Sequence, residues 1–288
     1  MLRSVCLWVF MIFMVFQAAG QEQYRVVFAG GRSYQVIENR FSMLQSGQLL
    51  DAEVALELVG ESRVVLMDEA GRLISLSLGG RYPLKDLQMS AVSDSSLFIK
   101  SVWDKYYEAY DEGGSVQEEL LARDTPLSFE LTIPSSSQFF GQTLFIQSTH
   151  ISSQGYELRY VNEYGEVVES ATQMASEMLL ALSQPPLVWK SEISIQVKRL
   201  DTKALSPIYT LRKLSPPDYE DIDRLLRKEF KGDLFEMELT KAAFFENQSL
   251  FADAQTVILS RRLELGSLMD NFWKYYLYKN GFYAMSRR

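Results

Sequence analysis

The chain has 288 residues, of which 47% are hydrophobic, and a formal net charge of −8 from 29 Lys and Arg against 37 Asp and Glu. An acidic chain without a local cluster of basic residues is repelled by phosphate backbones and anionic lipid surfaces, so the composition argues against nucleic acid as a partner. The length suffices for about two domains whose cores need no disulfide bonds.

The first twenty residues carry the pattern of a secretory signal segment. Arg3 supplies a short positive start, an uncharged apolar run extends from Val5 to Phe16, and small residues precede Gln21. The run is shorter than the roughly twenty apolar residues that a membrane-spanning helix needs. We therefore expect segment 1–20 to be cleaved, leaving no membrane span, and the mature chain to be exported to the periplasm or the extracellular space.

Cleavage would also remove Cys6, which is the only cysteine. A mature chain without a thiol can form neither a disulfide nor a cysteine-ligated metal site, and it has no cysteine nucleophile. With Arg3 subtracted from the 29 basic residues, 28 face 37 acidic ones, and the mature net charge becomes −9.

Residues 21–90 show the pattern of a β domain. Short, partly alternating apolar runs are bounded by Gly, Asp or Ser, as half-buried strands require. Asp68 to Gly71 separates two of these runs and predicts a hairpin turn with Gly71 in the left-handed conformation. The expected strands are YRVVFAG (24–30), QLLDAEVALELV (48–59), SRVVLMD (62–68) and RLISLSL (72–78).

The apolar and glycine positions of this region follow a fixed order. They run Leu44-x-x-Gly47-x-Leu49, then Ser62-Arg63-Val64-Val65-Leu66, then Leu73-Ile74-Ser75-Leu76, then Gly80-x-Tyr82-x-Leu84. This order resembles the FecR-type β domain of bacterial envelope proteins and implies a small curled sheet whose glycines turn the corners. Signalling members carry a cytoplasmic helical part before a membrane span, whereas four residues precede the apolar run here. The resemblance therefore concerns the β fold rather than a transmembrane anti-sigma role.

Residues 91–125 read as a helix followed by an acidic linker. Phe98, Val102 and Tyr106 recur at helical spacing within 93–110, after Ser and Asp residues that can cap a helix start. We expect an amphipathic helix that packs across a domain joint, with an aromatic binding face as the alternative. The stretch 111–125, DEGGSVQEELLARDT, is acidic and contains glycine, which predicts an exposed linker.

Residues 126–205 form a second region of short strands. Tyr164-Gly165 predicts a hairpin turn between two of them. The serines at 135–137 predict a loop, and segment 173–186 is expected to be a connection because its last two residues are prolines. The expected strands are PLSFELTIP (126–134), TLFIQSTHI (143–151), YELRYVN (156–162), EVVESAT (166–172) and EISIQVKRL (192–200).

The order of the motifs in this region is also distinctive. Leu144-x-Ile146 is followed by Tyr156-x-Leu158-x-Tyr160, a glycine-centred turn, a late Trp189 and Ile193-x-Ile195-x-Val197. This order resembles fibronectin III and other immunoglobulin-like sandwiches, and the strand spacing is typical of that architecture.

Residues 206–288 predict a helical subdomain. Ser215 is placed to cap a helix that begins with Pro216, with an acid at Asp218. The acids that follow do not form a calcium loop, since Ile222 and Asp223 occupy the fifth and sixth positions, where an oxygen ligand and a glycine are needed. We expect them to favour the positive end of the helix dipole instead.

The stretch AAFFENQSLFADAQTVILSRRLELG, residues 242–266, has the pattern of a helical hairpin. Small Ala242 and Ala254 allow two antiparallel helices to approach, and Phe245 and Phe251 fill the space between them. This pattern resembles a single tetratricopeptide unit. Because a solenoid needs about three repeats for a continuous core, we expect this unit to cap the second β region or to receive a partner.

The C-terminal stretch 272–283, FWKYYLYKNGFY, is dense in aromatic residues. One interpretation is a buried closing helix, and the other is an exposed platform for a partner protein or a glycan. The residues of such a platform are Trp273, Tyr275, Tyr276, Tyr278 and Tyr283.

Catalytic and cofactor motifs are weak throughout the chain. His150 is the only histidine, so a Ser-His-Asp triad would have to use it. The sequence contains no G-x-S-x-G elbow, P-loop or G-x-G-x-x-G motif. We therefore predict no catalytic, cofactor-binding or metal-binding residues and no enzymatic activity.

Taken together, the patterns predict an α+β, multi-domain chain with two mainly antiparallel β modules followed by a C-terminal helical subdomain. The predicted function is a non-catalytic secreted or periplasmic protein that binds or scaffolds partner proteins of the bacterial envelope. The alternative is a glycan-binding or carbohydrate-active protein that uses carboxylates and exposed aromatic residues.

Overall fold

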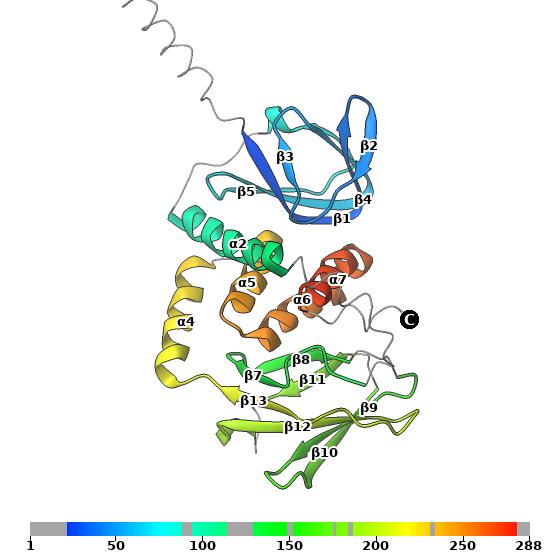
Figure 1. The fold of residues 1–288 in the computed structure, drawn as a ribbon, viewed down its shortest axis with the longest axis vertical. Helices are drawn as coiled ribbons and strands as arrows, with labels where there is room; N and C mark the ends of the chain where they lie inside the picture. The colour runs from blue at the N-terminus through cyan, green and yellow to red at the C-terminus, as the bar shows by residue number, and fades with distance from the viewer. Residues whose placement is uncertain are drawn as a thin grey trace, which may run out of the picture.

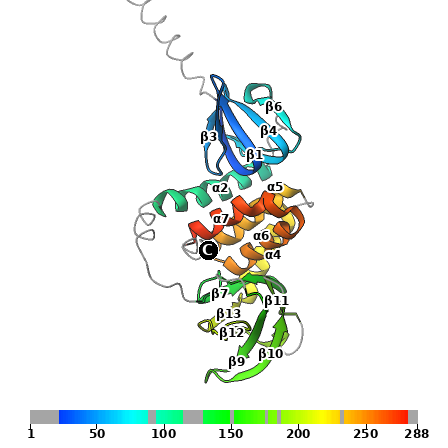
Figure 2. The same ribbon diagram turned by 90° about the vertical axis from the view of Figure 1, so that its right-hand side faces the viewer.

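A computed structural model describes residues 22–87, 94–113, 129–148, 152–174, 177–183, 187–230 and 234–280. The fold is α+β and multi-domain, as predicted. Two β modules lie at opposite ends of the molecule, and a helical region lies between them (Figures 1 and 2). The predicted signal segment 1–20 and most of the predicted linker lie outside the described residues, as does His150.

The first β module is a curled sheet in which the long strands β1 (Gln23–Ile37) and β4 (Ala55–Asp68) pair antiparallel along most of their length. One face encloses a core of its own that includes Leu56 and Leu66. The other face presents Phe28 and Val65 to the helices. The remaining elements are β2 (Arg40–Met43), β3 (Leu49–Asp51), β5 (Leu73–Leu76), β6 (Gly80–Pro83) and the short helix η1 (Leu84–Asp86).

The predicted turn between β4 and β5 is confirmed. The Gly71 amide donates to the Asp68 carbonyl over 3.0 Å, and Gly71 has a φ of +80°. The Asp68 carboxylate accepts from the amides of Ala70 and Arg72, which fixes the turn. A Cβ at Gly71 would clash with the backbone oxygen of Ser96, so glycine also allows the next helix to pack against the turn.

The second β module has two sheets that enclose one core. The larger sheet has the strand order β10-β9-β12-β13-β7, and the smaller one pairs β11 with β8. All these pairs are antiparallel except β13 with β7. The strands are β7 (Ser136–Phe139), β8 (Thr143–Gln147), β9 (Tyr156–Val161), β10 (Val167–Gln173), β11 (Glu177–Ala181), β12 (Glu192–Arg199) and β13 (Tyr209–Lys213), and the short helix η2 spans Leu187–Trp189.

Three strands of this module differ from the sequence prediction. β7 lies where the serines predicted a loop, β11 lies inside the predicted connection, and β13 lies beyond residue 205. Conversely, the described part of the predicted strand 126–134 forms only a bridge from Leu131 to Ser148. The second β module therefore extends to Lys213, and the predicted boundary at 205 is too early.

The helical region consists of α2, which follows the first β module, and a C-terminal group. The predicted helix at 93–110 is confirmed as α2 (Asp94–Gly113), and its Trp103 is fully buried among the other helices. The described end of the predicted exposed linker, up to residue 113, is helical. The C-terminal group comprises α4 (Pro216–Glu229), α5 (Phe235–Asn247), α6 (Phe251–Leu265), η3 (Gly266–Met269) and α7 (Asp270–Lys279).

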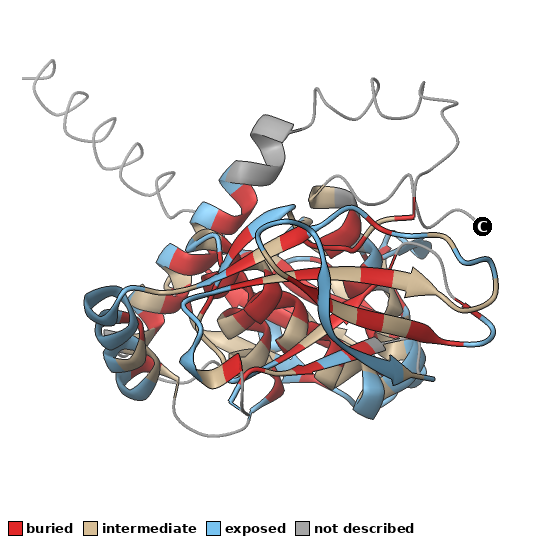
Figure 3. Ribbon diagram, turned by 90° about the horizontal axis from the view of Figure 1, so that it is seen from below, coloured by how far each residue is buried: buried red, intermediate tan, exposed pale blue. Residues whose placement is uncertain are grey.

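The predicted helical hairpin is formed by α5 and α6. Ala242 and Ala254 are buried within it, so the small side chains lie where the two helices approach. Its position differs from a simple cap, because the helices contribute to one core with the first β module and also pack against the second. In Figure 3 buried residues concentrate in these helices, whereas α4, on the left, is largely exposed.

Candidate functional site

The aromatic residues predicted as a platform do not form an exposed surface where they are described. Trp273 is 4% exposed and Tyr276 is fully buried, with their rings stacked at 5.2 Å. The Tyr276 hydroxyl donates to the carbonyl of Phe251, and burial raises the Tyr276 pKa well above its usual value. For these two residues the buried-helix interpretation holds. Tyr283 and the side chains of Tyr275 and Tyr278 lie outside the described residues.

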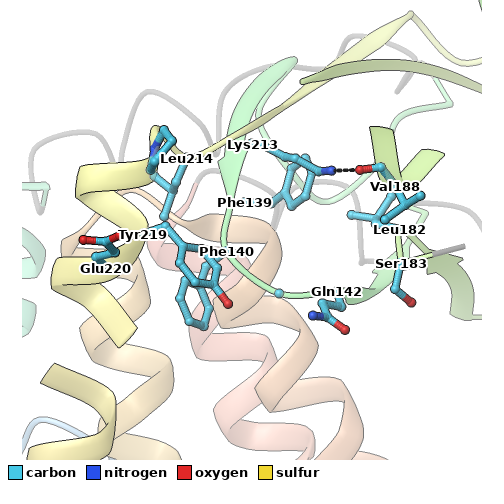
Figure 4. A pocket seen from close by; sticks show the side chains of 12 residues that line it. Phe139, Phe140, Gln142, Leu182, Ser183, Val188, Lys213, Leu214, Tyr219 and Glu220 are labelled. Carbon is cyan, nitrogen blue, oxygen red and sulfur yellow. Dashed lines mark hydrogen bonds between the residues drawn. The ribbon is translucent and has the colours of Figure 1, made fainter. Parts of the chain in front are cut away.

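A pocket of about 410 Å³ lies where the second β module meets α4 (Figure 4). This volume is in the range of small-molecule and anchor side-chain sites. Three parts of the chain that are distant in sequence form its walls: the turn between β7 and β8, the junction from β13 to α4, and Leu182 and Ser183 at the end of β11 together with Val188 of η2.

The first wall is the turn that contains Phe140 and Gly141. Their amides donate to the carboxylate of Asp253 over 2.9 and 2.6 Å. Asp253 lies in the first turn of α6, so the helical hairpin holds this wall of the pocket in place. A Cβ at Gly141 would lie 2.9 Å from the nearer carboxylate oxygen, which explains why a glycine suits this position.

The second wall is the start of α4. The Ser215 hydroxyl accepts from the Asp218 amide as the predicted N-cap, and Pro216 begins the helix. Tyr219 then stacks on Phe140 with ring centroids 4.7 Å apart and planes inclined by 21°. This ring pair joins the first two walls.

The third wall is held by backbone hydrogen bonds across the module. The amides of Leu182 and Ser183 both donate to the Gln142 carbonyl. Lys213, at the end of β13, donates from Nζ to the carbonyl of Val188. Trp189 follows Val188 directly and is 76% exposed, so a large aromatic side chain lies in solvent beside the pocket wall.

Two charged groups at the site, the Asp253 carboxylate and the Lys213 ammonium group, lie in different environments. Burial raises the Asp253 pKa to about 6, although the amides of Phe140 and Gly141 and the charge of Lys241 act in the opposite direction. Asp253 lies behind the wall and is occupied by the two amides, so it is not a group that a ligand would meet. Lys213 forms no ion pair with any residue that the structure describes, and Glu220 points away from it (Figure 4).

The lining of the pocket is suited to an apolar group of a ligand. Most of the lining is apolar or aromatic, and its polar groups are the Lys213 ammonium group, the Glu220 carboxylate and a few neutral groups. Within the described ranges, no group of three or more His, Cys, Asp or Glu side chains could hold a metal ion. The acids of α4 that resembled a calcium loop instead form ion pairs, Asp221 with Arg224 and Asp223 with Arg227.

Sequence reasoning did not find this pocket. The sandwich pattern predicts Trp189 as part of the second β module, yet its exposure shows that it does not belong to the core of that module. An isolated tryptophan after two prolines was the one local signal available. Phe140 and Tyr219 are far apart in the sequence and carry no common motif.

Asn247, the first residue of a glycosylation-type triplet, donates from its side chain to the Val102 carbonyl over 2.8 Å, so its amide is engaged within the fold. In the part of the chain that the structure describes, none of the helices is both long enough and apolar enough to cross a membrane.

Comparison with known proteins gives no match to a protein family and no match to a curated protein sequence.

Proposed function

We propose that this chain is a non-catalytic binding protein of the bacterial envelope, and that a partner protein inserts an apolar side chain into the pocket beside α4. The observation that carries the proposal is an apolar pocket with preformed walls next to the exposed Trp189. Aromatic anchors and apolar pockets are the features in which the binding energy of protein interfaces is concentrated.

The rigidity of the walls supports this proposal. Asp253, the Ser215 cap and the stacked pair of Phe140 and Tyr219 fix the pocket before a ligand arrives. A preformed site loses less conformational entropy on binding. The pocket therefore suits specific recognition of a partner side chain.

The proposed location outside the cytoplasm rests on the N-terminal signal pattern. A chain recovered from the envelope or the medium should begin at Gln21 by N-terminal sequencing. An intact Met1 in the cytosolic fraction would contradict export.

The domain assignments remain part of the same proposal. For the second β module, the order β10-β9-β12-β13-β7 in one sheet and the β8–β11 pair in the other support an immunoglobulin-like sandwich. For the first, the curled sheet with glycines at its turns is compatible with a FecR-like domain. The paired helices α5 and α6 are compatible with one tetratricopeptide-like unit.

The binding proposal is tested with a variant that fills the pocket. Ser183→Trp places a large side chain at an exposed position of the lining, and Ser170→Trp makes the same change on the exposed strand β10. We expect proteins captured from envelope extract by the wild type and by Ser170→Trp to be lost with Ser183→Trp. Equal capture by all three proteins would exclude the pocket as the binding site.

The alternative of glycan binding is favoured by one specific observation, the exposed Trp189 ring, since aromatic faces can stack on sugars. A glycan array probed with the wild type and with Trp189→Ala distinguishes the two functions. Binding that disappears with Trp189→Ala would support the glycan function, and silence of the array would remove it.

A further inference from the structure

Lys213 is the residue of the pocket that indicates the chemistry of a ligand, because its ammonium group favours an anionic partner. Its ammonium group has three N–H donors, and the structure shows one of them used by the Val188 carbonyl. Its surroundings are apolar, with Phe139 on the neighbouring strand and Leu182 and Val188 across the pocket (Figure 4). A charge in such surroundings is stabilised by an opposite charge within hydrogen-bonding distance.

Two of the other partly buried lysines have such a partner, whereas Lys241, which is also partly buried, forms no ion pair with a described residue. Lys198 lies 3.3 Å from a carboxylate oxygen of Glu157, and Lys279 lies 3.2 Å from one of Glu246. Lys213 has no carboxylate partner among the described residues. The acid nearest in the lining, Glu220, is exposed on α4 and directed away from Lys213 in Figure 4. The pocket thus combines an apolar cavity with an available positive charge.

Resting on the proposed function, we infer that the pocket binds the C-terminal end of a partner polypeptide whose last side chain is apolar. The terminal carboxylate pairs with the Lys213 ammonium group, and the apolar side chain fills the cavity between Phe140 and Leu182. A chain terminus carries both groups on one residue, which matches an ammonium group set directly beside an apolar cavity. Capture of a terminal carboxylate is a recurring mode of peptide recognition.

The rim can also accept the backbone of such a peptide. The side chains of Gln142 and Ser183 line the pocket and form no hydrogen bond with any described residue. They offer donors and acceptors to the amide and carbonyl groups that precede the terminal residue. Trp189 lies beyond Val188 and can cover a preceding side chain.

The test measures fluorescence anisotropy with the full mature chain and a short fluorescein-labelled peptide that ends in Leu-Phe. The peptide is used with a free C-terminal carboxylate and with an amidated C-terminus. We expect the free acid to bind roughly tenfold more tightly than the amide, a difference of about 1.4 kcal/mol, because only the acid can form a charge-assisted hydrogen bond with Lys213. Equal affinities of the two peptides, or no binding of either, would overturn the inference.

Three substitutions assign the preference to Lys213. Lys213→Met should reduce the affinity for the free acid to that for the amide, and Lys213→Arg should retain most of the preference. Lys190→Met removes a neighbouring exposed lysine that does not line the pocket, and it should change neither affinity. A preference that survives Lys213→Met would overturn the assignment.

The outcomes also separate this inference from the proposed function. If the amidated peptide binds as well as the acid and Ser183→Trp blocks both, the pocket remains a binding site and only the carboxylate assignment fails. If Ser183→Trp affects neither peptide binding nor partner capture, the proposed function fails as well. Decanoate that binds through Lys213 more tightly than the peptide would assign the pocket to fatty acids and overturn the peptide assignment.

Discussion

The helical region joins the two β modules in different ways. At the first module the joint is mainly apolar: the Phe28 ring lies 5.0 Å from Phe235 and 5.9 Å from Phe272. The Tyr107 hydroxyl of α2 adds a hydrogen bond to the Val26 carbonyl over 3.2 Å. At the second module α6 contributes hydrogen bonds in addition to packing. The Asp253 carboxylate accepts from the amides of the pocket turn, and the Thr256 hydroxyl accepts from the Phe145 amide over 2.9 Å.

The buried amide of Gln255 extends the polar joint. It lies 2.6 Å from the Thr132 hydroxyl of the second module. Apolar burial is non-directional and depends on volume, whereas hydrogen bonds depend on geometry and, at Asp253, on ionisation. The first joint should therefore respond to loss of volume and the second to pH and to small shifts of the backbone.

The largest effect is expected for Phe28→Ala. Removing a fully buried ring between the sheet and two helices should lower the free energy of unfolding by about 3–5 kcal/mol. Urea unfolding followed by circular dichroism measures this change. Phe41→Ala, at a side chain that is 57% exposed, is the control and should cost under about 0.5 kcal/mol. A similar cost for both variants would show that the first joint is not a packed core.

The next effect is a pH dependence that belongs to the second joint alone. The folded state raises the Asp253 pKa from 3.8 to about 6, so the folded chain holds this proton more tightly than the unfolded chain. The contribution of Asp253 is therefore most favourable below pH 3.8, and up to about 3 kcal/mol of it is lost as the pH rises to about 6.

Comparison with Asp253→Asn isolates this contribution from the other carboxyl groups. The wild type should gain stability relative to the variant when urea unfolding is measured at pH 4 instead of pH 7. The difference between the wild type and Phe28→Ala should stay constant over the same range. Parallel pH curves for the wild type and Asp253→Asn would show that Asp253 does not titrate within the joint.

A smaller effect tests the geometry of the polar joint. Gly141→Ala brings a Cβ to 2.9 Å from the Asp253 carboxylate and should cost about 1–3 kcal/mol through displacement of the turn. Gly79→Ala is a matched control, because its new Cβ meets nothing closer than 3.6 Å. Thermal unfolding of both variants provides the measurement. An unchanged melting temperature for Gly141→Ala would mean that the turn adjusts without loss.

Elements governed by local signals could be predicted from the sequence. The Gly71 turn, the Ser215 cap and the hairpin around Ala242 and Ala254 each depend on residues close to one another in the chain. Helix α2 was equally clear from its apolar spacing. In each case a short stretch contains both the conformational preference and the residues that satisfy it.

Elements that depend on pairing between distant segments could not be predicted from the sequence. β7 contains serines with little strand preference, and it forms because β13, more than seventy residues later, pairs with it in parallel. β11 is likewise defined by its partner β8. The pocket depends on the same distant contacts, since Phe140, Lys213 and Tyr219 meet only when both strands and α4 are in place. No local spacing predicts that meeting.

The smallest effect concerns α4, which leads from the second β module back to the helices. Ser215→Ala removes the N-cap and should cost about 1 kcal/mol, whereas Ser215→Thr keeps a capping hydroxyl and should cost less. Because Ile222 is the only apolar side chain of α4 that is buried, the loss should remain local. Hydrogen exchange should accelerate in the first turn of α4 and remain unchanged at the buried amides of α6.

Since Tyr219 stacks on Phe140, the same variant should also weaken peptide binding in the pocket. Accelerated exchange throughout α6 would instead show that α4 belongs to the polar joint and that its cap stabilises both.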